Sequence, residues 1–418
     1  MIRRHVVVML ATSYPRFPGD GIGTFMEPIA RGIAARGHEV HMVLPWHPRL
    51  ARGPVEEGVH FHPFRYAPHP SLNVFGYAAA MRADVRLRGA AWFAAPFGLA
   101  ASFLAARRVA REVGATILHG HWLVPSGAVV AAAAGALPAV ISLHGSDVYV
   151  AERHAAARRV ARAALGRVDW LTACSDDLRD RAIAIGADPA RAETIPYGVD
   201  VDRFRPDPQA RATARQAIGA GADDLVLFTA GRLVRKKGFD YLIDAVGLLA
   251  PRWPGLRLVI GGEGDLDAEL RERAGRAGVD GRVSFAGVLS QDEVAAGLAA
   301  ADVVVMPSIH DDAGNVDGLP NTVMEALASG TALVATRVGG IPSVVEDGRT
   351  GVLVAERDAQ ALADALGRLL ADPRARTRLG AAARADALAL RTWPRVAERF
   401  EQVYERAACR AEDRRGTV

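Results

Sequence analysis

Short apolar runs alternate with helical patterns along the chain, and this alternation restricts the fold more than any other feature. Each run has the length of one strand, ends at Gly, Pro or Ser, and leads into an Ala-rich amphipathic segment. Continuous apolar strands with helices between them indicate parallel sheets covered on both faces. The predicted strands are "HVVVMLATS", "HEVHMVLP", "GVHFHPFRY", "TILHGHW", "AVISLHG", "WLTACS" and "AETIPYG" in the first half, and "LVLFTAGRL", "LRLVIGGEG", "RVSFAGV", "ADVVVMPS", "ALVATRVGG" and "GVLVAE" in the second. We therefore predict an α/β protein with two doubly wound domains that bind ligands at the strand C-termini.

The chain length agrees with two domains, because 418 residues exceed what one ordinary core holds. The segment "GVDVDRFRPDP" carries two prolines and closes the first half, so we place the linker near residues 200–208. We expect one domain over residues 1–203 and a second over residues 204–392. The end of the chain predicts an amphipathic helix over about residues 393–412, which we expect to pack back onto the first domain, and a frayed tail in "CRAEDRRGTV".

The composition excludes several classes of protein. There are 51 basic and 47 acidic residues, and this mixed surface gives little support to a nucleic-acid binder. Two cysteines, Cys174 and Cys409, cannot form a disulfide framework, which favours a reducing cytoplasm. The N-terminus "MIRRHVVVMLATSYP" enters an apolar run with no cleavage site, so we interpret it as a first strand and not as a signal peptide.

The only two lysines of the chain are neighbours, Lys236 and Lys237, in the turn "AGRLVRKKGFDYLIDAV". This turn follows a predicted strand, and Gly238 permits a tight entry into the next helix. Arg232 offers a forked guanidinium and Lys237 a compact ammonium, a pair of cations that suits a diphosphate. A solvated basic turn is the alternative, but the placement of both lysines here favours the diphosphate.

The stretch "DGLPNTVMEALASG" places two acids, Asp317 and Glu325, on either side of a Gly-Leu-Pro turn. Pro320 predicts a helix start, so the helix runs from about Asn321 and stops at Gly330. Exposed N–H groups at that N-terminus attract a phosphate. Glu325 lies about one turn into the helix, where it can reach vicinal hydroxyls such as those of a ribose. An acid near a helix start also complements the helix dipole, but that explains only one of the two.

Two further segments carry weaker signals. Gly262 belongs to a Gly-Gly-x-Gly turn after a predicted strand, which is a ligand-binding loop or merely a tight turn. The backbone around Val288 in "VSFAGVLSQDEV" suits contact with a nucleotide base, although a strand and a helix cap explain the same residues.

These segments together resemble the retaining GT-B glycosyltransferases of the group 1, glycogen-synthase-like class. The stretch from Asp317 to Glu325 resembles the E-x7-E signature of that family. Nearly the whole chain follows the order of the family's motifs, with "IPYGVD", "GRLVRKKG", "GGEG", "FAGV", "MPS", "DGLPNTVMEALASG" and "TWPRVAERFEQVYERA". The resemblance implies the GT-B fold, in which two Rossmann-like domains face a central cleft.

The resemblance also implies roles for single residues. In such enzymes the first acid of the signature binds the donor sugar and the second binds the ribose, which here are Asp317 and Glu325. Arg232 and Lys237 then hold the diphosphate, and the backbone of Gly318 and Leu319 lies close to the sugar. The first acid is Asp where the family usually has Glu, so its reach, and hence the sugar it contacts, is left open.

In the first half, Gly21 and Gly23 open a predicted helix in "SYPRFPGDGIGTFMEPIA", which resembles the glycine-rich loop of the family. We expect its backbone to approach the transferred sugar. A dehydrogenase can begin in the same way, but no acid follows "HEVHMVLP" to take a ribose.

Four polar residues stand at the ends of two predicted strands in "ILHGHWLVPSG" and "ISLHGSDVY": His119, His121, His144 and Asp147. Ligands bind at that edge of a parallel sheet, although single histidines there often only complete a core. Similar enzymes keep a histidine near the donor sugar, so we place His121 first, with His144 and Asp147 beside it on the acceptor or sugar side.

We therefore predict a retaining glycosyltransferase that moves a sugar from a nucleotide-diphosphate sugar to a hydroxyl of a glycan, a lipid-linked molecule or a small molecule. The predicted catalytic residues are His121, Arg232, Lys237 and Asp317. We expect no cofactor and no metal, because no Asp-x-Asp follows a strand at this site and the histidines lack zinc-like partners. A nucleotide-sugar epimerase of the same fold and a non-catalytic sugar-nucleotide sensor are the alternatives.

One segment raises the question of a membrane. Residues 64–111 contain "WFAAPFGLAASFLAARRVAR" together with Arg82, Arg86 and Arg88, and no apolar run reaches the ~18–20 residues of a span. Apolar surface beside arginines suits a peripheral contact with the inner face of the cytoplasmic membrane and a lipid-linked acceptor. An ordinary buried helix with a solvated end explains the same residues, and this is the interpretation that we favour.

Overall fold

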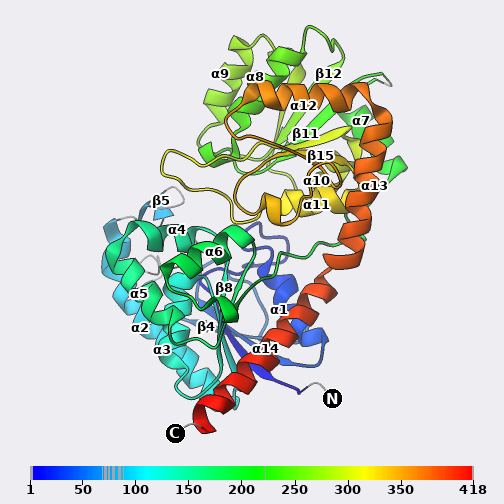
Figure 1. Ribbon diagram of the computed structural model, residues 1–418. Helices are drawn as coiled ribbons and strands as arrows, with labels where there is room; N and C mark the ends of the chain where they lie inside the picture. The colour runs from blue at the N-terminus through cyan, green and yellow to red at the C-terminus, as the bar shows by residue number, and fades with distance from the viewer. Residues whose placement is uncertain are drawn as a thin grey trace. The chain divides into compact units, whose positions relative to one another are not determined.

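The computed structural model describes residues 3–67, 69, 73, 76, 77, 81, 82, 86, 87, 89–221 and 223–416. Arg88 lies outside these residues, as do the side chains of residues 78–94 and therefore those of Arg82 and Arg86. The chain forms two compact units, Met1–Pro196 with Trp393–Val418 (unit 1) and Tyr197–Thr392 (unit 2), so the division falls a few residues before the expected boundary. Both units are doubly wound α/β domains, and the predicted fold class is confirmed (Figure 1).

The sheet of unit 1 has the order β10-β9-β8-β7-β1-β2-β4-β3, and every neighbouring pair except β3 and β4 is parallel. Its strands are β1 Val6–Leu10, β2 Glu39–Pro45, β3 Val55–Glu56, β4 Val59–Phe64, β7 Ile117–His121, β8 Ala139–Leu143, β9 Trp170–Ala173 and β10 Ala192–Thr194, and β5 Met81–Arg82 pairs with β6 Arg86–Leu87 separately. The strand order reverses between β1 and β7. In open α/β sheets ligands bind at such a switch point, beyond the strand C-termini.

Helices cover both faces of this sheet. They are α1 Met26–Ala35, α2 Gly89–Glu112, a π-helical turn Leu123–Gly127, α3 Ala128–Ala133, α4 Ser146–Arg153, α5 Ala155–Leu165, α6 Asp176–Ile185 and α14 Trp393–Gly416. The helix α14 lies beside α1 in Figure 1, and Phe400 and Tyr404 enter the same core as α1, β1 and β2. The expected frayed tail is wrong, because α14 remains helical to Gly416.

The sheet of unit 2 is entirely parallel, with the order β13-β12-β11-β14-β15-β16. Its strands are β11 Leu225–Ala230, β12 Leu256–Gly261, β13 Val283–Gly287, β14 Val303–Met306, β15 Ala332–Thr336 and β16 Val352–Val354. Its helices are α7 Pro208–Ala217, α8 Phe239–Leu249, α9 Asp267–Arg276, α10 Gln291–Ala300, α11 Asn321–Ser329, α12 Ala359–Ala371 and α13 Pro373–Leu390. This is the 3-2-1-4-5-6 order of dinucleotide-binding folds, and its switch point lies between β11 and β14.

Alternate residues of the central strands fill the two faces of this sheet. Leu227, Val305 and Val334 belong to the core that α8 and α12 close on one face. On the other face α10 approaches so closely that a side chain at Gly297 would lie 2.3 Å from the ring of Phe228. Both faces are therefore closed, and the open edge for a ligand is the carboxyl end of the strands.

Candidate functional site

The switch point of unit 2 joins the loops that follow β11 and β14. The Ile309 N–H donates to the Lys236 carbonyl at 2.9 Å, and the Thr322 hydroxyl donates to the Ala230 carbonyl at 3.1 Å. Gly238 has φ +64°, and a Cβ there would lie 2.0 Å from the Pro307 carbonyl oxygen. Only glycine fits at this position, because both the backbone conformation and the close approach exclude a side chain.

Both lysines of the chain meet Asp317 across this junction. Lys236 Nζ lies 3.1 Å from Oδ1 of Asp317, and Lys237 Nζ lies 2.7 Å from Oδ2. Burial by itself would raise the pKa of Asp317, but the ammonium groups of Lys237 and Lys236 outweigh it and hold that pKa well below its ordinary range. Asp317 is therefore ionised at neutral pH, and the cluster carries a net positive charge that suits an anionic ligand.

The N-terminus of α11 opens beside this cluster. The helix runs from Asn321, after Pro320, to Ser329, and Gly330 caps it with a left-handed φ of +67°, as the sequence predicted. The residues before it, Gly318 and Leu319, are buried. The first N–H groups of a helix carry partial positive charge and attract phosphate, so the helix adds to the field of the lysines.

Glu325 lies in the second turn of α11 and is half-buried. Burial raises its pKa to about 7, although the charges of Lys237 and Arg203 oppose the shift. A carboxyl group with this pKa is partly ionised at neutral pH and can accept or donate a hydrogen bond. Arg232 follows Gly231 after β11, and its side chain is exposed. The ammonium group of Lys237 lies over Gly231, so that a Cβ there would be 3.3 Å from Nζ.

The structure gives the weaker candidates of unit 2 separate explanations. A Cβ at Gly262, which has φ +129°, would lie 1.9 Å from the Gly231 carbonyl oxygen, so packing alone requires this glycine. The Gly262 N–H donates to the Gly287 carbonyl at 2.6 Å and is already used. Val288 lies just after β13 with 67% of its side chain exposed, which leaves it accessible to a ligand.

Two buried histidines of unit 1 sit on β7 with different surroundings. His119 Nδ1 is 2.9 Å from the Tyr404 hydroxyl, and its Nε2 is 2.7 Å from the Ser142 hydroxyl, so both ring nitrogens are satisfied inside the core. His121 Nδ1 is 3.0 Å from His144 Nε2, while Nε2 of His121 is buried and has no hydrogen-bond partner in the described part of the chain. An unsatisfied buried nitrogen is costly, and a bound hydroxyl would satisfy it.

The histidines at this switch point are neutral. Burial lowers the pKa of His121 to about 3, and it lowers that of His144 well below the ordinary value. A neutral imidazole acts as a hydrogen-bond donor or acceptor and not as a cation. The next residue, Trp122, has φ +69°, a strained conformation for a bulky side chain that is typical of functional sites.

Asp147 has a structural explanation at the start of α4. Its carboxylate accepts hydrogen bonds from the backbone N–H of Leu123 at 2.5 Å and of Gly145 at 3.0 Å. Burial raises its pKa to about 6 against these hydrogen bonds. Both oxygens are thus used to join two turns, which makes Asp147 a positioning residue.

The glycine-rich loop after β1 lies at the same switch point as His121. Gly23 has φ +63°, and a Cβ there would make only ordinary contacts, 3.6 Å from the backbone of Ser13, while a Cβ at Gly21 would meet nothing within 4 Å. The backbone conformation of Gly23 therefore favours glycine, whereas the structure gives no such reason for Gly21.

Sequence reasoning left out one residue of the cluster, Lys236. The rarity of lysine was a signal for it, but its salt bridge to Asp317, which lies far along the chain, could not be read from the sequence. Two absences concern only the residues described above: none of their helices is long and apolar enough to cross a membrane, and they contain no group of three His, Cys, Asp or Glu placed to hold a metal ion. The expectation of metal independence stays a prediction.

Two family models match successive parts of the chain. "Glycosyl transferases group 1" matches residues 210–386, and "Glycosyltransferase Family 4" matches residues 19–203. The first covers most of unit 2 and includes the lysine cluster and α11. The second covers most of unit 1 and includes the histidines.

The chain is also similar to named proteins. It is 40% identical over 256 residues to the GDP-mannose-dependent alpha-(1-6)-phosphatidylinositol monomannoside mannosyltransferase of Mycolicibacterium smegmatis. The matched region covers 60% of this chain and 65% of that protein. It is 35% identical over 320 residues to the D-inositol 3-phosphate glycosyltransferase of Nocardioides sp., which covers 70% of this chain and 67% of that protein. Anabaena HepE in complex with UDP has the same fold, with a TM-score of 0.75 at 20% identity over 96% of this chain and 99% of that one.

Proposed function

The chain belongs to the group 1 glycosyltransferases, which makes it a nucleotide-sugar-dependent glycosyltransferase of the GT-B fold, and we propose that it transfers the sugar with retention of anomeric configuration. Retention rests on the resemblance to the retaining enzymes of the family. One observation carries the donor site: two lysines, a carboxylate and a helix N-terminus converge at the switch point of unit 2. A nucleotide-diphosphate sugar supplies the negative charge, and the sugar and ribose hydroxyls, that such a site would bind.

GDP-mannose is the first donor that we propose. The support is that the 40% identical protein of Mycolicibacterium smegmatis is a GDP-mannose-dependent mannosyltransferase. The residues of the site in this chain fit any nucleotide-diphosphate sugar. In this proposal Lys237 and Arg232 hold the diphosphate with the N-terminus of α11. Glu325 accepts hydrogen bonds from the ribose hydroxyls, and Asp317 accepts one from a hydroxyl of the sugar. Lys236 neutralises the charge of Asp317.

The reaction that we propose breaks the bond between the anomeric carbon and the diphosphate oxygen and forms a bond from the same carbon to an acceptor oxygen on the same face. The lysine cluster and α11 stabilise the negative charge that grows on the leaving diphosphate. The proton of the acceptor hydroxyl passes to the leaving phosphate oxygen. His121 remains neutral throughout, and its unsatisfied Nε2 is proposed to hydrogen-bond a sugar hydroxyl and thereby orient the sugar.

For the acceptor we propose a hydroxyl of a phosphorylated inositol, free or lipid-linked. Both relatives described above carry such acceptors in their names, and this is the support for the choice. The acceptor would bind to unit 1, at the switch point that holds Gly21, Gly23 and His121.

Proton NMR of the product tests the proposal. The purified protein is incubated with GDP-mannose and an inositol phosphate acceptor, and the anomeric configuration of the first product formed is read from the one-bond coupling between C1 and H1, because the H1–H2 coupling of a mannoside is small in both anomers. An α-linked product from the α-linked donor supports retention, and a β-linked product would overturn it. Sugar interconversion without acceptor would instead reveal an epimerase, and donor binding without turnover on any acceptor would reveal a sensor.

A matched pair of variants ties the activity to the site. Lys237→Met removes a cation that we place on the diphosphate. Arg235→Met removes a cation two residues away that pairs with Asp240 and Glu269. We expect Lys237→Met to lose sugar transfer and Arg235→Met to keep it. Equal rates in both variants would show that the diphosphate does not bind to this loop.

A further inference from the structure

The long helix α2 presents large apolar side chains to the outside of unit 1. Phe97 is 66% exposed and Leu104 is 65% exposed, and the smaller Ala100 is exposed between them. The opposite side of the helix is buried and carries small residues such as Ser102 and Ala106. A surface helix normally shows the reverse pattern, with its largest apolar residues turned inward. The favoured prediction of an ordinary buried helix therefore accounts for only one side of α2.

A second helix of unit 1, α5, is basic on its outer side. Residues 153–167, "RHAAARRVARAALGR", contain five arginines and no acid. Arg158, Arg159 and Arg162 are exposed, and Val160 between them is 47% exposed. Within the described residues these three arginines form no ion pair, whereas arginines of neighbouring elements are paired, as Arg181 is with Asp177. Three unpaired cations on one helix favour an external anionic partner.

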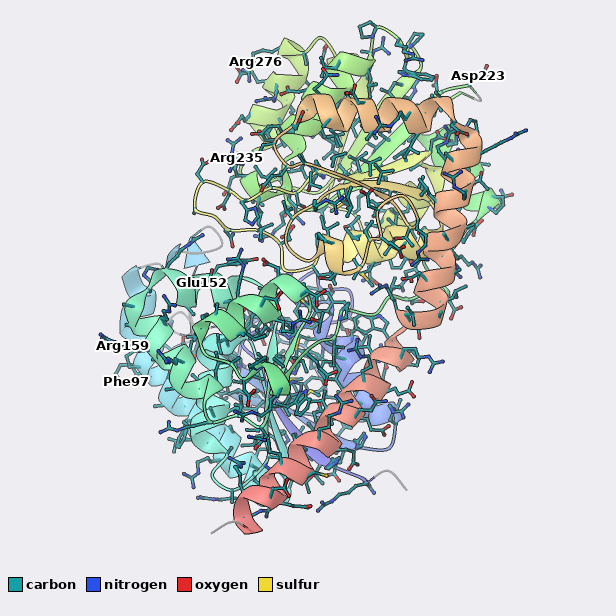
Figure 2. The ribbon with its side chains drawn as sticks, in the orientation of Figure 1. Phe97, Glu152, Arg159, Asp223, Arg235 and Arg276 are labelled. Carbon is teal, nitrogen blue, oxygen red and sulfur yellow. The ribbon has the colours of Figure 1, made fainter. Side chains whose placement is uncertain are left out.

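The two helices lie in one layer. Helix α3 packs against both α2 and α5, and its own outward residues are alanines. Figure 2 shows Phe97 of α2 and Arg159 of α5 at the same outer edge of unit 1. Two arginines at the end of α2, Arg108 and Arg111, are also exposed. We call the exposed side chains of Phe97, Leu104, Arg158, Arg159, Val160 and Arg162 the α2–α5 surface.

We propose that the α2–α5 surface binds a membrane that contains anionic phospholipids. Arginines supply attraction to the lipid head groups, and Phe97 and Leu104 supply apolar area that inserts below them. Nucleic acid would use the arginines but would leave these two apolar side chains without a partner. The inference does not depend on the proposed sugar transfer, because the surface shares no residue with the donor cluster.

Vesicle co-sedimentation of the full chain tests the proposal. We expect binding to vesicles of phosphatidylcholine with phosphatidylglycerol, weak binding to phosphatidylcholine alone, and release at high ionic strength. Replacing Arg158, Arg159 and Arg162 by Gln should weaken binding roughly a hundredfold, since each arginine near an anionic surface contributes a factor of about five. The control removes the same charge from unit 2 through Arg368→Gln, Arg374→Gln and Arg378→Gln, which are exposed on α12 and α13.

The apolar part of the surface has its own measurement. A fluorophore sensitive to polarity is attached at Leu104→Cys in a Cys409→Ser background, because Cys409 is exposed whereas Cys174 is buried. We expect its emission to rise and shift to the blue on anionic vesicles. A label at Leu390→Cys, a 60% exposed position of unit 2, should not respond. An unchanged far-UV circular dichroism spectrum and an unchanged Tm would show that the triple arginine variant is folded.

Three results would overturn the proposal. One is no binding to anionic vesicles, and another is equal loss of binding in the two arginine triples. The third is an unchanged emission of the Leu104→Cys label on vesicles that the protein does bind. Tight, salt-sensitive binding to RNA together with no vesicle binding would reassign the arginines to nucleic acid.

Discussion

Replacing Lys236 tests whether its ion pair with Asp317 allows Lys237 to bind the diphosphate. Lys236 is 8% exposed, and its Nζ lies 3.1 Å from Asp317, which Lys237 also contacts at 2.7 Å. When a diphosphate binds Lys237, Asp317 still has Lys236 as a counter-ion. In Lys236→Met the diphosphate must compete with a buried carboxylate for a single ammonium group. We therefore expect weaker diphosphate binding, although the substituted residue does not touch the ligand.

The size of the effect follows from what remains in the site. Breaking a buried ion pair outright costs about 3–5 kcal/mol, because a charge is left uncompensated. Here Lys237 still compensates Asp317 in the free protein, and the loss appears only as competition with the ligand. We expect about 1.4 kcal/mol, which is about a tenfold rise in the Kd of GDP.

Titration calorimetry with GDP and with GMP separates this effect from a general disturbance. GMP has no second phosphate, so its Kd should change less than about twofold by the same reasoning. In the Asp317→Asn background no carboxylate competes for Lys237, and the additional loss on Lys236→Met should nearly vanish. Equal losses for GDP and GMP, or a loss that is the same in both backgrounds, would refute the reasoning.

Two further predictions concern the loops and the second acid. In thermal unfolding, Gly238→Ala should destabilise unit 2 by about 3 kcal/mol, because a Cβ would meet the Pro307 carbonyl. The control is Gly219→Ala, which has the same φ of +64° but nothing within 4 Å of a Cβ, and it should cost about 1 kcal/mol. Equal costs at the two glycines would show that the β14 loop yields to the new side chain. The pKa of Glu325 is raised to about 7, so ionised Glu325 forms mainly above that pH, and GDP-mannose should bind about tenfold more tightly at about pH 8 than at about pH 6. Glu325→Gln should remove this dependence in calorimetric titrations, and a pH dependence that survives the substitution would assign it to another group.

The stability of the free protein should follow the opposite sign. Burial favours the protonated form of Glu325, so its contribution to folding is present at low pH and falls as the pH rises through the range from its ordinary value to about 7. Tighter nucleotide binding and lower stability of the free protein should thus appear together as the pH rises.

The sequence predicted the strands of the two main sheets except the short β3, because buried parallel strands are continuous apolar runs. "LVLFTAGRL" and "ADVVVMPS" became β11 and β14, and the loops after them hold the lysines and Asp317. The rarity of lysine pointed to the right loop. The helix Asn321–Ser329 was predicted from local Pro and Gly signals alone, which act within a few residues.

The remaining features depend on contacts between distant residues. His119 and His121 look alike in sequence, and only the partners Tyr404 and Ser142 show that His119 is a core residue. Asp147 looked like a ligand-binding acid until its oxygens were found on the backbone of Leu123 and Gly145. The sequence also did not predict how α2 is oriented about its axis, because its composition does not tell which side faces the sheet. The short strand β3 pairs antiparallel at the sheet edge and has too few residues to show a pattern.

Thermal shift with UDP, GDP and ADP tests the central claim most directly, that a nucleoside diphosphate binds at the switch point of unit 2. The measurement compares the unmodified protein, Lys237→Met and Arg235→Met. The account predicts that one of the three nucleotides, with GDP expected first, raises the Tm of the unmodified protein and of Arg235→Met and leaves that of Lys237→Met unchanged. Equal stabilisation of all three proteins, or no shift with any nucleotide, would contradict it.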